Sequence, residues 1–317
     1  MQQTDLPKVS IIVPTYNEEK DIRHTLDALT GLDYPHTEII AIDDSTDRTP
    51  DIIREYAPHG VQLLRPTTRE GRCGARNLGI QHSTGDIVVV LNADVLLPSD
   101  FLKRIVPHYL AGADYVLVES TVANPDSLYA RFIDSEGKLD YGSSDMIEWT
   151  EAFSCRRAVI LDVGLFPVGF PVPMAAGEDG FVGESLHARG YRKTIDRSIV
   201  VRHFAPSSFS EYWGQQVGRG KGFVQVRVFL KREPSPWVLM RTALKTLWVA
   251  LWIAMVLTWL WRAWQISRHS PQRWRDWLPF LWIVLVQRGA NSVGEYTALN
   301  EIWKANRIAR KLDFHRA

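Results

Sequence analysis

Short apolar runs rich in β-branched residues alternate with segments of helical periodicity over the first third of the chain. The apolar runs have the length of strands and lie at Val9–Val13, Glu38–Ile42, Val61–Leu64, Ile87–Leu91 and Tyr115–Val118. The segments with helical periodicity lie at Glu18–Leu29, Thr49–Tyr56, Gly71–Gln81 and Phe101–Leu110. Strands that are apolar throughout are buried on both faces, and strands that alternate with helices usually pair in parallel. The pattern predicts an α/β fold with a mostly parallel, doubly wound sheet flanked by helices.

Polar residues follow three of these strands directly. They are Pro14-Thr15-Tyr16-Asn17-Glu18, Asp43-Asp44 and Asn92-Ala93-Asp94. Ligands of open α/β sheets bind outside the carboxyl ends of the strands. We therefore expect these side chains to converge on one crevice.

The stretch from Asp114 to Pro206 is less regular and rich in Gly, Pro and aromatic residues. It is expected to form loops and short strands that shape a pocket over the first half. Within it, Phe166–Gly177 contains three prolines and two glycines. This segment is either a loop that closes over substrate or a static surface connection.

Two apolar segments mark the last third of the chain. Thr246–Trp261 carries no charge but is shorter than the ~20 residues of a spanning helix, and Trp277–Val286 is shorter still. If both crossed a membrane, the loop between them would carry its cations outward, against the positive-inside tendency. These cations are Arg262, Arg268, Arg273 and Arg275. We expect helices in the cytoplasmic membrane interface or re-entering it, with a spanning hairpin as the alternative.

Composition narrows the class of protein. With 317 residues and 45% hydrophobic content, the chain can bury one large core or two small ones. The net charge of +1 gives no indication of nucleic acid binding. The two cysteines, Cys73 and Cys155, have no metal-like spacing and are expected to be packing residues in a reducing compartment. Met1–Lys8 is short and polar, unlike a signal peptide, so we expect the N-terminal domain to be cytoplasmic.

Five stretches, in this order, resemble the nucleotide-sugar domain of family 2 glycosyltransferases. They are Val9–Glu18, Ile42–Asp47, Gly71 with Ala75-Arg76-Asn77, Gly85-Asp86 leading into Asn92-Ala93-Asp94, and Gly177-Glu178-Asp179. The resemblance implies a GT-A fold. It also implies a catalytic domain at about 1–230, with a nucleotide-sugar half at about 1–118 and an acceptor half at about 119–230. Residues 231–317 would form a membrane-associated helical region.

The resemblance implies a set of donor-binding residues, which are Pro14, Tyr16, Glu18, Asp43, Arg76, Asn92, Ala93, Asp94 and Arg219. It assigns Asp43 to the nucleobase, whereas Asp44 better fits a turn or helix-capping role. Arg76 lies on a helix that begins near Gly71 and could reach the diphosphate, with a solvated surface position as the alternative.

A divalent cation, Mg²⁺ or Mn²⁺, is the expected cofactor. Asp94 would bind it together with phosphate oxygens of the donor, because such hard cations prefer oxygen ligands. The chain departs here from the usual Asp-x-Asp, since Asn92 replaces the first acid and removes one negative charge. His203, after a strand-like segment, is either a further metal ligand or a structural histidine.

Glu178 and Asp179 begin a helix-like segment. The resemblance makes Asp179 the general base, which takes the proton of an acceptor hydroxyl as that oxygen displaces the diphosphate in line and inverts the anomeric centre. The alternative is that Asp179 only complements the helix dipole.

Gln216-Val217-Gly218-Arg219-Gly220 resembles the Gln-x-x-Arg-Trp element of the family, with glycine in place of the tryptophan found in processive synthases. This difference and the small number of apolar segments argue against a polymer synthase. Gln216 and Lys221 are expected on the acceptor side, where Arg219 and Lys221 would meet the diphosphate or an anionic acceptor or else form a solvated helix face.

The expected function is that of an inverting, metal-dependent glycosyltransferase. It would move a sugar from a UDP- or GDP-sugar to a lipid-linked acceptor at the cytoplasmic membrane face. One alternative is transfer to the phosphate of a polyprenyl phosphate. A second is a sugar-nucleotide-binding membrane subunit with weakened catalysis, for which Asn92 is the motive. A nucleotidyltransferase is disfavoured because no Gly-rich, basic loop follows the first strand.

Overall fold

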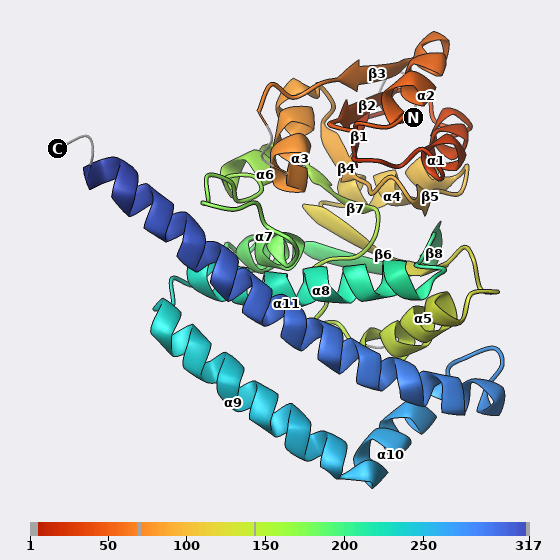
Figure 1. The fold of residues 1–317 in the computed structure, drawn as a ribbon. Coiled ribbons are helices and arrows are strands. Elements are labelled where there is room, and N and C mark those ends of the chain that lie inside the picture. The colour runs from red at the N-terminus through yellow and green to blue at the C-terminus, as the bar shows by residue number, and fades with distance from the viewer. Residues whose placement is uncertain (1–5, 69–70, 143, 315–317) are drawn as a thin grey trace. The chain divides into compact units, whose positions relative to one another are not determined.

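The computed structural model describes residues 6–68, 71–142 and 144–314, which form two compact units (Figure 1). The first, here called the sheet unit, comprises Met1–Ala123, Asp145–Val168 and Asp179–Phe204. The second, the helical unit, comprises Asn124–Ser144, Gly169–Glu178 and Ala205–Ala317. Part of the expected acceptor half thus groups with the C-terminal helices, and a functional division at about residue 230 stays a prediction.

All strands of the described residues belong to one eight-stranded sheet in the sheet unit, in the order β3-β2-β1-β4-β7-β6-β8-β5. Their bounds are β1 Val9–Thr15, β2 Thr37–Asp43, β3 Val61–Leu64, β4 Ile87–Val90, β5 Val95–Leu96, β6 Tyr115–Val122, β7 Phe153–Arg156 and β8 Lys193–His203. β1 to β4 pair in parallel, as do β6 and β8, whereas β7 and β5 are antiparallel to their neighbours. The mostly parallel sheet predicted from the sequence is confirmed.

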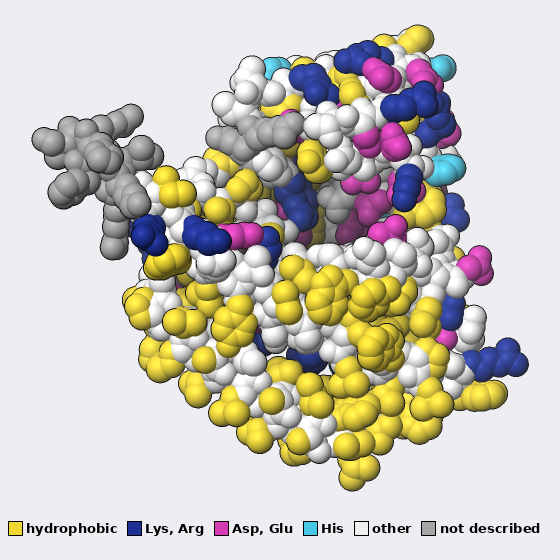
Figure 2. Space-filling model, in the orientation of Figure 1, with side chains coloured by type: hydrophobic (Ala, Val, Ile, Leu, Met, Phe, Trp, Pro, Cys, Tyr) yellow, Lys and Arg dark blue, Asp and Glu magenta, His cyan; other side chains and the backbone are white. Residues whose placement is uncertain are grey.

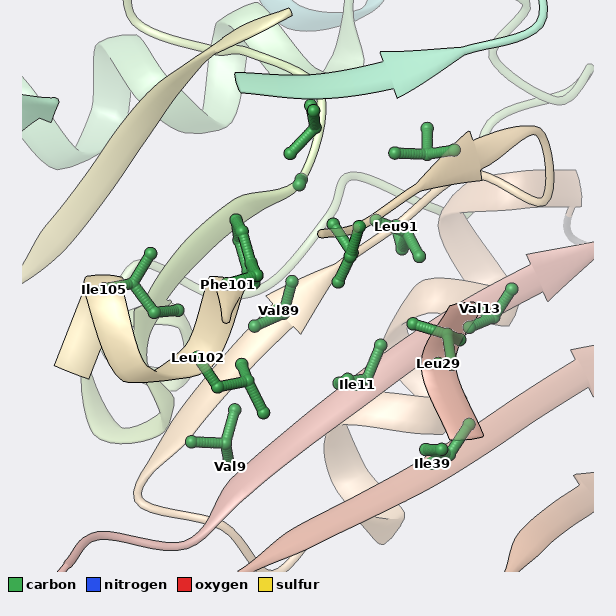
Figure 3. Packing of buried hydrophobic residues seen from close by; sticks show 14 of the residues in the cluster. Val9, Ile11, Val13, Leu29, Ile39, Val89, Leu91, Phe101, Leu102 and Ile105 are labelled. Carbon is green, nitrogen blue, oxygen red and sulfur yellow. The ribbon is translucent and has the colours of Figure 1, made fainter. Parts of the chain in front are cut away.

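Helices of the sheet unit pack on both faces of this sheet. Their bounds are α1 Ile22–Thr30, α2 Thr49–Glu55, α3 Gly71–His82, α4 Phe101–Leu110, α6 Arg157–Asp162 and α7 Glu178–Ala188, with a 3₁₀ turn, η2, at Ala57–His59. Ile11 of β1 and Val89 of β4 lie in the core with Phe101 and Leu102 of α4 (Figure 3). On the other face, a Cβ at Gly79 of α3 would lie 2.5 Å from side-chain atoms of Ile12 and Ile42, so glycine permits the close approach of helix and sheet.

The first helix is shorter than the sequence predicts. It begins at Ile22 rather than Glu18, because Asn17 has a φ of 56° and the carbonyl of Glu18 accepts the amides of Asp21 and Ile22 in a turn. This places 16–18 in a loop directly after β1. The cysteines are free and buried, as expected, and burial raises the pKa of the Cys155 thiol.

The helical unit contains α5 Leu128–Tyr141, α8 Phe209–Gln225, a π-helical turn η3 at Val226–Leu230, α9 Ser235–Ala254, α10 Val256–Ser267 and α11 Trp274–Phe314. Phe132, Tyr212 and Phe280 form the centre of one of its apolar clusters. Arg131 donates to both carboxylate oxygens of Asp276, at 2.8 and 2.9 Å, and joins α5 to α11 inside the unit.

The apolar segment Thr246–Trp261 is not one helix. The chain turns at Met255, between α9 and α10. Thr258 Oγ1 donates to the carbonyl of Met255 at 2.8 Å, and Trp259 Nε1 to that of Ile253 at 2.9 Å, so side chains satisfy the carbonyls freed by the break. The other segment, Trp277–Val286, lies within α11, where Phe280, Ile283 and Val284 are buried.

Within the described residues, one helix is long and apolar enough to cross a membrane. It is α9, with a mean hydropathy of 1.3 over its most apolar window, of which 11% is buried inside the protein. Its apolar side chains are therefore mostly uncovered.

Candidate active site

Asp43 ends β2 and is fully buried. Its carboxylate accepts from Thr15 Oγ1 at 2.8 Å, from Ser45 Oγ at 2.5 Å and from Arg65. These bonds fix the ends of β1 and β2 together and occupy most of the oxygen lone pairs. Arg65 is the partner that a ligand can displace, since 47% of its side chain is exposed.

The loop after β1 is hydrogen-bonded to the loop after β2. The amide of Asn17 donates to Ser45 Oγ at 2.7 Å, and its Oδ1 accepts the amide of Thr46 at 3.0 Å. Pro14 is half-buried and Tyr16 is 56% exposed. The loop therefore offers an exposed aromatic ring next to the end of β2.

Asn92 uses both ends of its amide. Its Oδ1 accepts from Arg76 at 3.1 Å, and its Nδ2 donates to Glu151 at 3.1 Å. Arg76 is 2% exposed and lies over the rings of Phe166, at 4.9 Å, and Trp149, at 5.7 Å. An aspartate at position 92 could not donate to Glu151 and would repel it. Arg76, expected near the diphosphate, thus also positions the residue that replaces the first acid of Asp-x-Asp.

Asp94 lies in the turn between β4 and β5, where Ala93 is buried and accepts from Thr25 Oγ1 at 2.5 Å. Burial raises the pKa of Asp94 to about 8, and the carboxylates of Glu151 and Glu18 contribute to the rise. Burial also raises the pKa of Glu18. A cation beside these carboxylates would offset both their burial and their mutual repulsion.

His203 ends β8 close to Asp94. The antiparallel register pairs His203 with Val95, the residue after Asp94, and the amide of Phe204 donates to the carbonyl of Asp94 at 2.9 Å. Within the described residues, no group of three or more His, Cys, Asp or Glu is arranged to hold a metal by itself. A metal held by Asp94 and His203 would need further ligands, such as oxygens of a bound donor, and the binding of a metal by these two residues stays a prediction.

Asp179 lies in the first turn of α7, after Gly177 with a φ of 86° and after the fully buried Glu178. Its Oδ1 accepts the amide of Gly180 at 2.7 Å. One turn later, a Cβ at Gly183 would overlap the carbonyl oxygen of Glu148, so α7 packs closely on that segment. Since Glu151 in the same segment contacts Asn92, the fold ties α7 to the region of Asp94. That Asp94 and Asp179 line one cavity stays a prediction.

The expected acceptor-side residues lie on α8 in the helical unit. Gln216 is buried, Arg219 is exposed, and Lys221 donates to Glu301 at 2.6 Å. A Cβ at Gly220 would overlap the carbonyl of Asn291 in α11. Glycine at this position is therefore required by close helix packing, and a tryptophan has no room.

The loop Phe166–Gly177 is anchored at its start. Asn77 of α3 accepts the amide of Phe166 at 2.9 Å and donates to its carbonyl at 2.8 Å. In the helical unit, Gln225 accepts the amide of Ala175 at 2.7 Å. Closure of the loop over substrate stays a prediction.

Known proteins are similar to this chain in sequence and in fold. The family model described as Glycosyl transferase family 2 matches residues 10–162. Glycosyltransferase AglE of Haloferax volcanii is 30% identical over 260 residues, which cover 78% of this chain and 80% of AglE. The chain belongs to glycosyltransferase family 2.

A second relative is also similar over most of its length. The dolichyl N-acetyl-alpha-D-glucosaminyl phosphate 3-beta-D-2,3-diacetamido-2,3-dideoxy-beta-D-glucuronosyltransferase of Methanococcus voltae is 37% identical over 232 residues, covering 67% of this chain and 71% of that enzyme. The mannosyltransferase PcManGT of Pyrobaculum calidifontis, solved with GDP-Man and Mn²⁺, superposes with a TM-score of 0.54 at 23% identity, over 96% of this chain and 76% of that one. The fold is thus of the GT-A type, and the protein is a glycosyltransferase.

Three residues at this family 2 site have no local sequence signal. Glu151 and Trp149 come from the irregular stretch before β7, and Arg65 follows β3. No motif marks them, and their positions depend on contacts with residues far away in the sequence. Only the acidic side chain of Glu151, in a stretch expected to shape the pocket, indicates a role in the site.

Proposed function

We propose that this family 2 protein is an inverting, metal-dependent glycosyltransferase that moves a sugar from a nucleotide sugar to a hydroxyl of a lipid-linked acceptor. The observation that supports it best lies at the carboxyl end of the sheet, where burial, together with the carboxylates of Glu151 and Glu18, raises the pKa of Asp94 to about 8. Such a concentration of negative charge is destabilising unless a cation occupies the site, and it is the kind of perturbation found at functional sites.

The donor would lie along the ends of β1, β2 and β4. Asp43 would accept a hydrogen bond from the base once Arg65 moves aside, with Pro14, Tyr16 and Glu18 along the base and ribose. Asn92 and Ala93 would line the site beside Asp94, and Arg219 would meet the diphosphate. Arg76 would act chiefly by fixing Asn92, since its guanidinium is buried against Phe166.

Asp94 and His203 would hold the cation, Mg²⁺ or Mn²⁺. When bound, the cation supplies electrostatic stabilisation of the charge that develops on the departing diphosphate. The protein groups fit this role because a carboxylate and an imidazole are ligands of Mn²⁺, while a carboxylate suits Mg²⁺.

Asp179 would act as the general base, with Glu178 beside it in the chain. Its carboxylate takes the proton of the acceptor hydroxyl while that oxygen forms a bond to the anomeric carbon. The bond from this carbon to the diphosphate oxygen breaks on the opposite face, and the diphosphate leaves with the electron pair. One in-line displacement inverts the anomeric configuration.

The acceptor is proposed to be a saccharide linked to a lipid, met on its polar side by Gln216 and Lys221. The name of the Methanococcus voltae relative describes transfer to a dolichyl-linked sugar. The uncovered apolar surface of α9 would hold the site at a membrane, with the catalytic units on the cytoplasmic side.

Thermal stabilisation by UDP- and GDP-sugars with and without Mn²⁺ tests the donor site, because a ligand that binds only the folded state raises its apparent stability. We expect one nucleotide class to raise the melting temperature only when the metal is present. Release of nucleoside diphosphate with lipid-linked acceptors then tests turnover. Asp179→Asn should retain metal-dependent donor binding and lose transfer to a hydroxyl. Retained transfer would indicate that the acceptor is already anionic, as the phosphate of a polyprenyl phosphate is.

A further inference from the structure

A cleft of about 620 Å³ lies in the helical unit, far in sequence from the donor-binding residues. It is lined by Trp252, Leu257, Thr258, Trp261, Arg262 and Arg288. Two arginines in the lining of a mostly apolar cleft are unusual, since charged groups that leave water need a partner.

Arg262 already has partners within the helical unit. It donates to Asp140 at 2.7 Å and lies 3.7 Å from Glu136, both on α5. Its charge is therefore offset by the protein.

Arg288 differs, because among the described residues its buried Nε has no hydrogen-bond partner. Its guanidinium lies over the ring of Trp252, at 5.4 Å from the centroid. Stacking on an aromatic face orients an arginine without neutralising it. Arg288 thus brings a positive charge to the cleft that remains available to an anion.

The rim of the cleft is apolar and exposed. Leu257 is 80% exposed and Trp261 is 59% exposed. Hydrophobic side chains gather over the same helices, α9 to α11, in Figure 2. An anion that fits this cleft should therefore carry hydrocarbon next to its charge.

We propose that the cleft binds an anionic membrane phospholipid. Its phosphate pairs with Arg288, and its acyl chains lie along Trp252, Leu257 and Trp261. A free phosphate would gain nothing from the apolar rim, and a zwitterionic phospholipid carries a cationic headgroup that offsets its phosphate and weakens pairing with Arg288. The inference rests on the membrane attachment proposed above but not on the proposed catalytic roles.

The experiment compares binding of the full-length protein to phosphatidylcholine vesicles with binding to vesicles that also contain phosphatidylglycerol. We expect Arg288→Gln to lower the preference for phosphatidylglycerol roughly tenfold, the size of one charge-assisted hydrogen bond. Arg268→Gln is the matched control, because Arg268 also stacks on a tryptophan, Trp264 at 5.0 Å, but lies outside the cleft. It should change the preference less than twofold.

Equal losses in the two variants would reduce the effect to general surface charge and overturn the site. An unchanged preference for phosphatidylglycerol in Arg288→Gln would also overturn the lipid site. The same holds if inorganic phosphate raises the melting temperature as much as phosphatidylglycerol does. If Arg288→Gln fails to fold, Trp261→Ala at the exposed rim serves instead, with a several-fold weaker binding to mixed vesicles expected. Metal-dependent donor binding, measured separately in detergent, stays intact in these variants, so failure of the lipid site and failure of the proposed function are distinguishable.

Discussion

Replacing Asp94 by asparagine should stabilise the metal-free protein at alkaline pH. The substitution keeps the size of the side chain and removes a carboxyl group whose pKa is raised to about 8 by burial and by Glu151 and Glu18. A group with a raised pKa in the folded state binds more protons there than in the unfolded chain. Stability therefore falls as the pH rises from about 4 to about 8, and asparagine removes this loss.

The expected gain in stability of Asp94→Asn follows from the pKa of Asp94. A rise from 3.8 to about 8 corresponds to at most roughly 6 kcal/mol, at about 1.4 kcal/mol for each pKa unit. Because burial also raises the pKa of Glu18, which can take up a proton in place of Asp94, we expect a smaller gain of about 2–3 kcal/mol at pH 9. For a folded unit of this size, a gain of about 2–3 kcal/mol raises the melting temperature by roughly 5–10 °C at pH 9. At pH 4 the rise should be close to zero.

The assay is thermal unfolding of both proteins between pH 4 and pH 9 in the presence of a chelator. Asp51→Asn is a suitable control, because Asp51 is exposed and pairs with Arg54 in its own helix, α2. A difference between Asp94→Asn and the original protein that does not grow with pH would refute the reasoning. Adding Mn²⁺ with the nucleotide should reverse the order, since only the original protein gains from the metal.

Three further predictions concern single residues. Gly220→Trp should lower the melting temperature by several degrees, because a Cβ there lies under 3.0 Å from the backbone of Asn291 and overpacking costs about 1–3 kcal/mol. The control is Gly218→Ala, whose Cβ meets no atom within 4 Å, and an unchanged melting temperature in Gly220→Trp would contradict the close packing of the two helices. Asn92→Asp should lower donor turnover at least tenfold, because the new carboxylate repels Glu151, and adding Glu151→Gln to this variant should restore part of the turnover. Full turnover in Asn92→Asp alone would exclude the proposed contribution of the hydrogen bond between Asn92 and Glu151 to the site. Asp179→Asn should lower the rate of transfer to a hydroxyl by roughly 10²–10⁴-fold, measured by steady-state kinetics, while metal-dependent donor binding, measured by thermal shift, persists. Loss of both transfer and donor binding would instead indicate a structural role for Asp179.

The parallel part of the sheet could be predicted because its signal is local. Apolar β-branched runs separated by periodic segments identified β1 to β4, and the residues after those strands identified the candidate site. The antiparallel strand β7 could not be found in this way. Its pairing with β4 and β6 is set by contacts between residues far apart in the sequence, and the stretch around it shows no periodicity.

In the helical unit, too, the sequence pattern does not predict how the segments pack. The apolar segments at Thr246–Trp261 and Trp277–Val286 were visible, but their roles depend on packing. One is divided at Met255, and the other supplies Phe280 and Ile283 to a buried cluster. Only α9 leaves an uncovered apolar surface of spanning length among the described helices. Apolar content alone does not distinguish these uses.

The departure at Asn92 is better explained by charge than by loss of catalysis. The amide joins Arg76 to Glu151, and the carboxylates of Glu151 and Glu18 already contribute to the raised pKa of Asp94. A fourth acid at position 92 would raise the pKa of Asp94 further and make its ionisation harder at neutral pH. With the pKa at about 8, a cation must displace a proton from Asp94, so metal affinity should rise with pH by up to about tenfold per unit below that value. The amide therefore keeps Asp94 within reach of ionisation, which is what a functioning metal site requires.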